Sequence, residues 1–341
     1  MKIYDDYLNT IKSAISADRK FRSKISTFEA YDKTLKKAFS YADLNKSIPQ
    51  MQLLPSFNDL ADEIGLKPNF DQKLGLHPDF AHLKGTDKTE FNYIVSVFID
   101  IKGSTNLFSK YDPETVLIIN TTIQRAAIHT CLVFGGYIHR LQGDGLFVYF
   151  GGKNIEPKTA ALRALQSTSM FTYFVKNDLK NLFLEQDIDK IFTRIGIDLG
   201  KNKDVIWSMA GIGEISEVTT CSLHTSLASK MQGSAESNGI VLGDNVKSNT
   251  DLQFQELMQP VSKRTGNESD RYIFRIPSEK FFYTQYDLDW LNFLKLQSFI
   301  LTDLTGEVKL KRKNVIPPDR KIENLRPVAA QNKPYLNGSN K

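Results

Sequence analysis

The stretch from Tyr93 to Thr105, YIVSVFIDIKGST, decides the fold of this chain. Its first nine residues form a nearly unbroken apolar and β-branched run, which predicts a strand buried on both faces. Asp100 lies near the end of that run, where an ionised carboxylate is costly unless it is paired or binds a cation. Gly103, Ser104 and Thr105 follow, and residues this small let backbone N–H groups approach phosphate oxygens closely.

A second carboxylate lies in a tight turn. Residues 137–142 and 146–150 have the pattern of two short strands, and the sequence GDG around Asp144 joins them as a hairpin. If the first strand lies beside this hairpin, Asp144 and Asp100 converge. Two carboxylates about one metal diameter apart can hold divalent ions, which clamp a triphosphate and activate a hydroxyl. Alone, Asp144 also fits an ordinary turn residue and Asp100 a strand-end cap; together they predict a metal site.

The remaining pattern extends this hairpin into a domain. From Tyr93 onward the expected order is β-α-β-β-α-β with one added hairpin. That order predicts a ferredoxin-like α+β sheet with helices on one face. The expected strands are 93–101, 137–142, 146–150, 191–199, 205–212, a strand near 240 and 272–276, and the expected helices are 113–134, 157–181 and 222–232.

The segments outside this domain differ from it in composition. Residues 1–90 read as an extension that is helical to about residue 47 and then irregular, with four prolines. We therefore place the α+β domain at 91–277. Residues 278–304 are expected to contain one packed helix, from Tyr286 to Leu304, and residues 305–341 a flexible basic tail.

Composition and charge exclude several classes of protein. The chain has 341 residues, 41% of them hydrophobic, which is an ordinary globular composition. The net charge of +5 resides in residues 305–341, which hold nine Lys/Arg and three Asp/Glu, so the body is near neutral. A nucleic-acid-binding body is therefore not expected, although the tail could contact phosphates or anionic lipid. Cys131 and Cys221 are too few for a disulfide framework or a four-cysteine zinc site. Without a signal core or a run of roughly 20 apolar residues, the sequence predicts a cytoplasmic protein with no membrane insertion.

At this point the sequence resembles a known family, the class III nucleotidyl cyclases. VSVFIDIKGSTNLF (95–108) and LQGDG (141–145) resemble their metal strand and metal turn. RIGIDLG (194–200) and SMAGIGEISEVTTCSLHTSLASKMQ (208–232) resemble their dimer-interface strands and the helix with transition-state residues. The resemblance implies a head-to-tail homodimer in which each site takes metal aspartates from one subunit and base- and transition-state-binding residues from the other. The implied reaction is attack of the ribose 3′-hydroxyl of a nucleoside triphosphate on its α-phosphate, which yields a 3′,5′-cyclic nucleotide and diphosphate.

The resemblance also assigns roles to individual residues. Asp100, Ile101 and Asp144 would bind two Mn²⁺ or Mg²⁺ ions. Ser226 falls where the family has the Asn that orients the ribose, and Lys230 falls on the Arg that stabilises the pentavalent phosphate. Serine reaches less far than asparagine, and lysine lacks the guanidinium fork that grips two oxygens.

The phosphate chain would meet two further groups. Gly103, Ser104 and Thr105 form the substrate-binding turn after the metal strand. Arg271 falls near the family's triphosphate-binding Lys and keeps its charge; it also fits an ordinary surface cation.

The implied base reader is Arg140, four residues before Asp144. Arginine has donors and no acceptor, which argues against guanine and suits the O2 and O4 carbonyls of uracil; cytosine offers only O2 and N3. Thr219 takes the place of an Asp found in adenylate cyclases, and Tyr93 could narrow the pocket to a single ring. This combination resembles the pyrimidine cyclases of bacterial Pycsar anti-phage systems. It implies conversion of UTP to cyclic UMP for antiviral defence, with a separate effector protein that responds to the product.

Three other interpretations remain open. The same chemistry could act on CTP or ATP. The domain could instead be catalytically silent and bind a nucleotide or a partner. A nucleic-acid binder acting through residues 305–341 is the third, and a steep loss of affinity with salt would support it.

Overall fold

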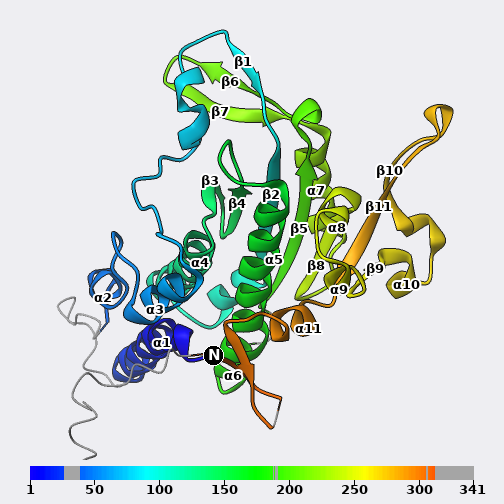
Figure 1. The fold of residues 1–341 in the computed structure, drawn as a ribbon. Coiled ribbons are helices and arrows are strands. Elements are labelled where there is room, and N and C mark those ends of the chain that lie inside the picture. The colour runs from blue at the N-terminus through cyan, green and yellow to red at the C-terminus, as the bar shows by residue number, and fades with distance from the viewer. Residues whose placement is uncertain (27–38, 187, 189–190, 305, 312–341) are drawn as a thin grey trace, which may run out of the picture. The chain divides into compact units, whose positions relative to one another are not determined.

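A central mixed sheet organises the chain (Figure 1). The computed structural model describes residues 1–26, 39–186, 188, 191–304 and 306–311, and residues 1–310 form one compact unit. The strand order in the eight-stranded sheet is β10-β11-β8-β5-β2-β4-β3, with β9 paired to β11. These strands are β2 (Ile94–Lys102), β3 (Tyr137–Gln142), β4 (Gly145–Phe150), β5 (Phe192–Gly200), β8 (Gly239–Gly243), β9 (Met258–Pro260), β10 (Tyr272–Ile276) and β11 (Phe281–Leu288).

The apolar run that opens the domain is a central strand, as its sequence predicts. β2 pairs antiparallel with β4 on one side and with β5 on the other. β5 and β8 are parallel. The α+β class and the predicted order of elements are confirmed.

Helices cover both faces of this sheet rather than one. α4 (Pro113–Val133) and α5 (Pro157–Tyr173) pack on the face that carries Val95, Val97 and Ile99, whereas α7 (Leu223–Ser234) lies on the opposite face. Gly196 on β5 allows α7 to pack this closely on the opposite face, because a Cβ at position 196 would lie 2.0 Å from the carbonyl oxygen of Ala228 in α7. The expectation that the helices share one face is therefore wrong for α7.

α4 is the most apolar long helix of the part of the chain described here. Its 21 residues are long and apolar enough to cross a membrane, but 67% of its apolar 18-residue stretch is buried inside the protein. Asp112 caps its N-terminus, because its side chain accepts a hydrogen bond from the backbone N–H of Thr115 at 3.0 Å. Burial of this kind is typical of a core helix.

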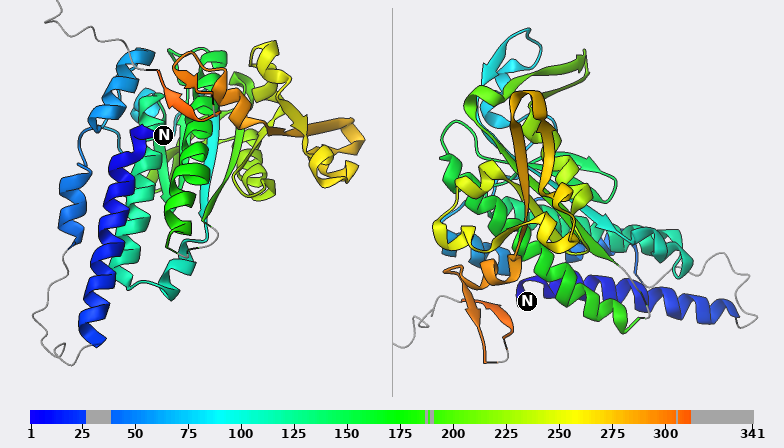
Figure 2. Two further views of the ribbon diagram at one scale, coloured as in Figure 1. Left: turned by 90° about the horizontal axis from the view of Figure 1, so that it is seen from below. Right: turned by 90° about the vertical axis from the view of Figure 1, so that its right-hand side faces the viewer.

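The N-terminal helices belong to the same unit as the sheet. α1 (Asp5–Ser26) lies alongside α4, as the left view of Figure 2 shows, and α2 (Tyr41–Ser47) and α3 (Pro55–Ile64) pack nearby. The hydroxyl of Tyr4 lies 2.8 Å from the Oγ1 of Thr130, and that of Tyr7 lies 2.5 Å from the Nδ1 of His129. Residues from this segment therefore contribute to the main hydrophobic core.

The segment from Tyr286 to Leu304, expected to be one helix, is mostly strand and loop. β11 extends to Leu288 and pairs with β8, β9 and β10. Only α11 (Trp290–Lys295) is helical there, and β12 (Ile300–Thr302) then pairs with β13 (Val308–Leu310). The prediction is wrong because three strands from elsewhere in the chain take up the backbone hydrogen bonds of β11. The expected tail from 312 lies outside the described residues.

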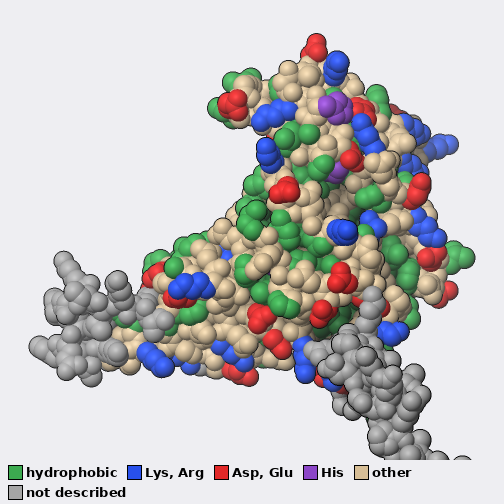
Figure 3. Space-filling view, turned by 60° about the vertical axis from the view of Figure 1, so that its left-hand side comes forward, with side chains coloured by type: hydrophobic (Ala, Val, Ile, Leu, Met, Phe, Trp, Pro, Cys, Tyr) green, Lys and Arg blue, Asp and Glu red, His purple; other side chains and the backbone are tan. Residues whose placement is uncertain are grey.

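A second, three-stranded sheet consists of β1 (Thr89–Phe91), β6 (Ile206–Ile212) and β7 (Ile215–Cys221). It lies beyond one end of the main sheet, at the top of Figure 1. Ile212 and Ile215 at the tip of its β6–β7 hairpin are 76% and 82% exposed. Figure 3 shows hydrophobic side chains among charged ones on this upper part of the surface. The shorter helices of the unit are α6 (Lys180–Leu184), α8 (Asp244–Ser248), α9 (Leu252–Gln255) and α10 (Val261–Thr265).

Candidate active site

The segments that carry the two predicted metal aspartates lie side by side. β2 and β4 pair with Ile99 opposite Leu146, so the turn around Asp144 meets the end of β2. A Cβ on Gly145 would lie 2.5 Å from the carbonyl oxygen of Ile99 and 3.4 Å from the Cα of Asp100. Glycine is therefore required at position 145 for this close approach.

Asp100 is held by three donors, two of them cationic. Arg194 is its register partner on β5, with Nη2 3.3 Å from Oδ2 of Asp100. The Nζ of Lys102 lies 3.0 Å from the same oxygen, and the Nε2 of Gln232 on α7 donates to it at 3.0 Å. The sequence reasoning missed Arg194 and Gln232. The strand pattern of 191–199 carried a signal for Arg194, since it is the one basic side chain in that alternating run.

The turn after β2 connects the two aspartates. Gly103 adopts φ +90° and precedes a 3₁₀ helix over Ser104–Ser109. The buried hydroxyl of Ser104 donates to Oδ2 of Asp144 at 2.5 Å, whereas Thr105 is exposed. The conformation at Gly103 is one that side chains disfavour, which accounts for glycine at the start of this turn.

The ligands available here suit a hard divalent cation. Asp100 and Asp144 offer carboxylate oxygens, and the carbonyl of Ile101 belongs to the same strand end. Among the described residues there is no group of three or more His, Cys, Asp or Glu side chains placed to hold a metal. Mg²⁺ and Mn²⁺ accept a few carboxylates completed by water and substrate phosphates, so this sparse set of oxygen donors fits them.

Arg140 on β3 pairs with Glu217 on β7. Its Nε donates to Oε2 of Glu217 at 2.6 Å, and its Nη2 contacts Oε1. Gly75 lies against this glutamate with φ +66°, and a Cβ there would lie 2.7 Å from the Cβ of Glu217. The Arg140 side chain remains 42% exposed, so part of the guanidinium still faces solvent. The sequence reasoning missed Glu217.

Next to Arg140, the buried His139 lies against the half-buried Thr219. The Nε2 of His139 lies 3.1 Å from Oγ1 of Thr219. Burial, reinforced by the positive charge of Arg140, lowers the pKa of His139 to about 3, so its imidazole is neutral at physiological pH. Thr219 thus adjoins the predicted base reader but already has a partner in the protein.

The structure does not bring Tyr93 to these residues. Its ring belongs to the main core, and its hydroxyl donates to the carbonyl of Ile155. Tyr93 precedes Asp100 by seven residues, and an odd separation in an extended strand directs side chains to opposite faces. The aromatic ring therefore packs on the α4–α5 side, away from the aspartate.

Ser226 lines an open groove of about 640 Å³ between β6, β7 and the start of α7. Thr219 lines the same groove, whereas neither Asp100 nor Asp144 does. Lys230 is exposed one turn after Ser226, and its Nζ lies 6.0 Å from the ring centroid of Phe274. The other lining residues are Lys203, Asp204, Ile206, Ser208, Ala210, Thr220, Cys221, Ser222, Leu223 and Thr225.

Arg271 lies apart from both groups, at the end of a 3₁₀ turn before β10. Its Nη1 pairs with Oε1 of Glu268 at 3.1 Å, and both side chains are largely exposed. Within this single chain it therefore contacts neither the aspartates nor the groove lining.

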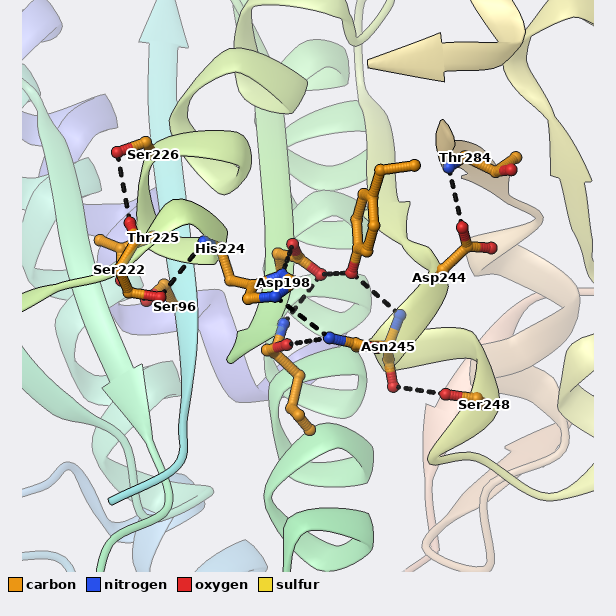
Figure 4. Close-up of polar contacts among 12 residues, drawn as sticks. Ser96, Asp198, Ser222, His224, Thr225, Ser226, Asp244, Asn245, Ser248 and Thr284 are labelled. Carbon is orange, nitrogen blue, oxygen red and sulfur yellow. Dashed lines mark hydrogen bonds and ion pairs between the residues drawn. The ribbon is translucent and has the colours of Figure 1, made fainter. Parts of the chain in front are cut away.

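A buried polar network fixes the first turn of α7 (Figure 4). Asp198 on β5 is fully buried; its Oδ2 lies 2.9 Å from the Nδ1 of His224, and its Oδ1 accepts from the hydroxyl of Tyr283 at 2.7 Å. Asn245 on α8 adds a contact of 3.4 Å to the other ring nitrogen of His224. Burial raises the pKa of the Asp198 carboxyl despite these partners. The network anchors the helix that carries Ser226 and Lys230.

Known proteins with similar sequences have one activity in their names. A cytidylate cyclase of Staphylococcus aureus is 35% identical over 257 residues, covering 75% of this chain and 59% of that protein. A cytidylate cyclase of Escherichia coli is 30% identical over 305 residues, covering 85% of this chain and 65% of that protein. This chain is a relative of the cytidylate cyclases. It spans less than two thirds of the length of either relative.

Solved structures similar to this cyclase-family chain are cyclases of other nucleotides. An adenylyl cyclase of P. aeruginosa matches 59% of this chain and 95% of its own, with 18% identity and a TM-score of 0.48. A guanylyl cyclase matches 59% of this chain and 92% of its own, with 16% identity and a TM-score of 0.46. No protein-family model matches the sequence.

Proposed function

We propose that this chain is a metal-dependent pyrimidine nucleotide cyclase. It would convert a pyrimidine nucleoside triphosphate into the 3′,5′-cyclic monophosphate and diphosphate in the cytoplasm. The observation that carries the proposal is the close approach of the Asp144 turn to Asp100, beside the turn of small residues that begins at Gly103. The names of the relatives support the same class of reaction.

Each cluster would have a separate task. Bound Mn²⁺ or Mg²⁺, two ions per site, would neutralise phosphate charge and favour ionisation of the 3′-hydroxyl. Asp100 and Asp144 would hold the ions, with the carbonyl of Ile101. The backbone of Gly103, Ser104 and Thr105 would receive the phosphates.

The groups on α7 and β10 would act at the ribose and the phosphates. Ser226 would orient the ribose from the groove. Lys230 would meet charge that develops on the α-phosphate, and Arg271 the triphosphate chain. The separation of the groove from the aspartates within one chain supports a head-to-tail homodimer in which two chains complete each site. The exposed Ile212 and Ile215 would then be covered by the second copy.

The proposal also concerns which pyrimidine base the substrate carries. Considered alone, the Arg140 donors favour UTP, and hence cyclic UMP, because uracil presents two carbonyl acceptors. CTP is the second candidate, because the relatives are named cytidylate cyclases. Tyr93 is left out of the proposed pocket, since its hydroxyl and ring are engaged in the core.

The biological role follows from the resemblance to Pycsar cyclases. The cyclic nucleotide would be a second messenger in anti-phage defence, detected by a separate effector protein. Infection of cells that carry this gene, with or without the Asp144→Asn change, would test that role. Protection that survives the change would contradict it.

A turnover assay tests the chemistry. Purified chain with Mn²⁺ receives ATP, GTP, CTP or UTP, and chromatography identifies any cyclic product. A cyclic pyrimidine nucleotide that depends on Asp144 supports the proposal. No product from any of the four, with the dimer present, would instead indicate a nucleotide-binding domain without catalysis.

A further inference from the structure

We propose that Glu217 is a base-reading residue that works with Arg140, and that the pair selects cytosine over uracil. This inference rests on the proposed function, because it concerns the base pocket of that site. It assigns a role to a side chain that the family's metal and transition-state positions do not include.

The contact between Arg140 and Glu217 leaves both residues with unused hydrogen-bonding capacity. Glu217 receives Nε–H of the guanidinium on one oxygen and Nη2 on the other. A carboxylate has about four lone-pair sites, so each oxygen can accept again. Arg140 retains its Nη1 hydrogens and one on Nη2, and its side chain is 42% exposed. The pair therefore presents a donor group and an acceptor group next to each other.

This arrangement matches the edge of one pyrimidine better than the other. Cytosine has an amino donor at the 4-position and two acceptors, N3 and O2, beside it. The amino group suits Glu217, and the two acceptors suit the remaining hydrogens of Arg140. Uracil has a carbonyl at the 4-position, and an ionised carboxylate facing that oxygen would repel it. The acceptor thus reverses the preference that Arg140 alone would give.

The surroundings of Glu217 hold it in place. Gly75 lies so close that any Cβ there would have to displace the glutamate, and its φ of +66° suits glycine. The backbone of Gly75 bridges the two strands, since its N–H donates to the carbonyl of His139 and its carbonyl accepts from Val218. Thr219, two residues after Glu217 and on the same side of β7, lines the groove that holds Ser226. The base-facing groups and the ribose-facing groove are therefore contiguous along β7.

The test is the Glu217→Gln variant of the full chain, with Glu185→Gln at the exposed position after α6 as matched control. Equilibrium binding of CTP and UTP is measured by calorimetry, and turnover of each nucleotide is measured separately. We expect the wild type to prefer CTP. Glu217→Gln should weaken the binding of CTP by about tenfold or more. The affinity for UTP should stay within about threefold, because the glutamine amide can donate to the uracil 4-carbonyl. Glu185→Gln should change the affinity and turnover of neither nucleotide.

Equal losses of affinity and turnover for the two nucleotides would overturn the inference. Glu217 would then serve only to link the two strands through its ion pair with Arg140. If Glu217→Gln does not fold, Glu217→Asp keeps the charge but withdraws it by one methylene, and it should lower the CTP-to-UTP ratio in the same direction. A wild type that binds CTP selectively without forming product would contradict the proposed function alone. A wild type that prefers UTP in both measurements would contradict this inference alone.

Discussion

Single residues set the chemistry of the site, and Asp144 is the most direct test of it. Its side chain has one described partner, the hydroxyl of Ser104. Asp144→Asn keeps the size of the side chain but removes the charge that a metal needs. We expect product formation to fall by at least about 10²- to 10³-fold, the usual cost of removing a transition-state electrostatic group.

The control for Asp144 is Asp87→Asn, in the exposed loop before β1. Both variants should keep the melting temperature of the wild type, which differential scanning fluorimetry would check. Full turnover by Asp144→Asn in the presence of Mn²⁺ would exclude the two-aspartate metal site.

Some residues of the candidate site could be predicted from the sequence, and others could not. Asp100 and Asp144 could be selected because one interrupts a buried strand and the other occupies a glycine turn. Arg194 left only one signal, as the single basic side chain of its alternating run, and Glu217 left none. Their partners Asp100 and Arg140 are 94 and 77 residues away, and only strand register or a third segment brings them near. For Tyr93 the sequence reasoning left out the strand parity that turns the ring to the core side of the sheet.

Among the elements, α7 depends most on one buried contact. His224→Ala would leave the Oδ2 of Asp198 without its ring partner in a fully buried position. Leaving a buried hydrogen-bonding group without its partner costs about 1–3 kcal/mol, so the free energy of unfolding should fall by that order. Denaturant titration measures it, with the exposed His82→Ala as control.

The loss of unfolding free energy in His224→Ala, relative to the wild type, should depend on pH in a defined direction. Burial raises the pKa of Asp198, so the folded state holds its proton more tightly than the unfolded state does. The contribution of Asp198 to stability is therefore largest below its ordinary pKa and declines as the pH rises. The variant should consequently be nearer to the wild type in acid than at neutral pH. An equal deficit at both would contradict a charged Asp198 in the folded state.

Elements with a strong local pattern were predictable, and those stabilised from a distance were not. β3 and β10 match their expected ranges, because turn residues bound them on both sides. β11 was not predicted as a strand, because its apolar residues fit a helix as well and only β8, β9 and β10 decide between the two. The position of α7 on the second face likewise depends on the absence of one side chain, at Gly196.

On the scale of the whole molecule, buried histidines should make the protein sensitive to acid. Burial lowers the pKa of His129 to about 4, well below its ordinary value near 6.5. The unfolded chain therefore takes up a proton first, and stability declines as the pH falls from about 6.5 to about 4. Over this range His129 lowers the free energy of unfolding by on the order of 3 kcal/mol. His129→Gln should flatten the decline in denaturant titrations across that range; an unchanged slope would contradict the assignment.

The proposed dimer is the other property of the whole molecule. Replacing Ile212 and Ile215 by serine should convert a dimer to a monomer in analytical ultracentrifugation and abolish turnover, because each site would lose half of its groups. Circular dichroism should not change, since both side chains are exposed in the single chain. Leu252→Ser, 78% exposed on α9, is the matched control. A double variant that remains dimeric would place the interface elsewhere.

The two cysteines make nucleotide binding directly observable. Cys131 is fully buried, and burial raises the pKa of its thiol to about 12, so it resists alkylation. Cys221 is exposed and lines the groove beside Ser226. A thiol-reactive fluorophore should therefore attach at one position without any mutation. Its emission would report ligand entry in real time, independently of whether a cyclic product forms.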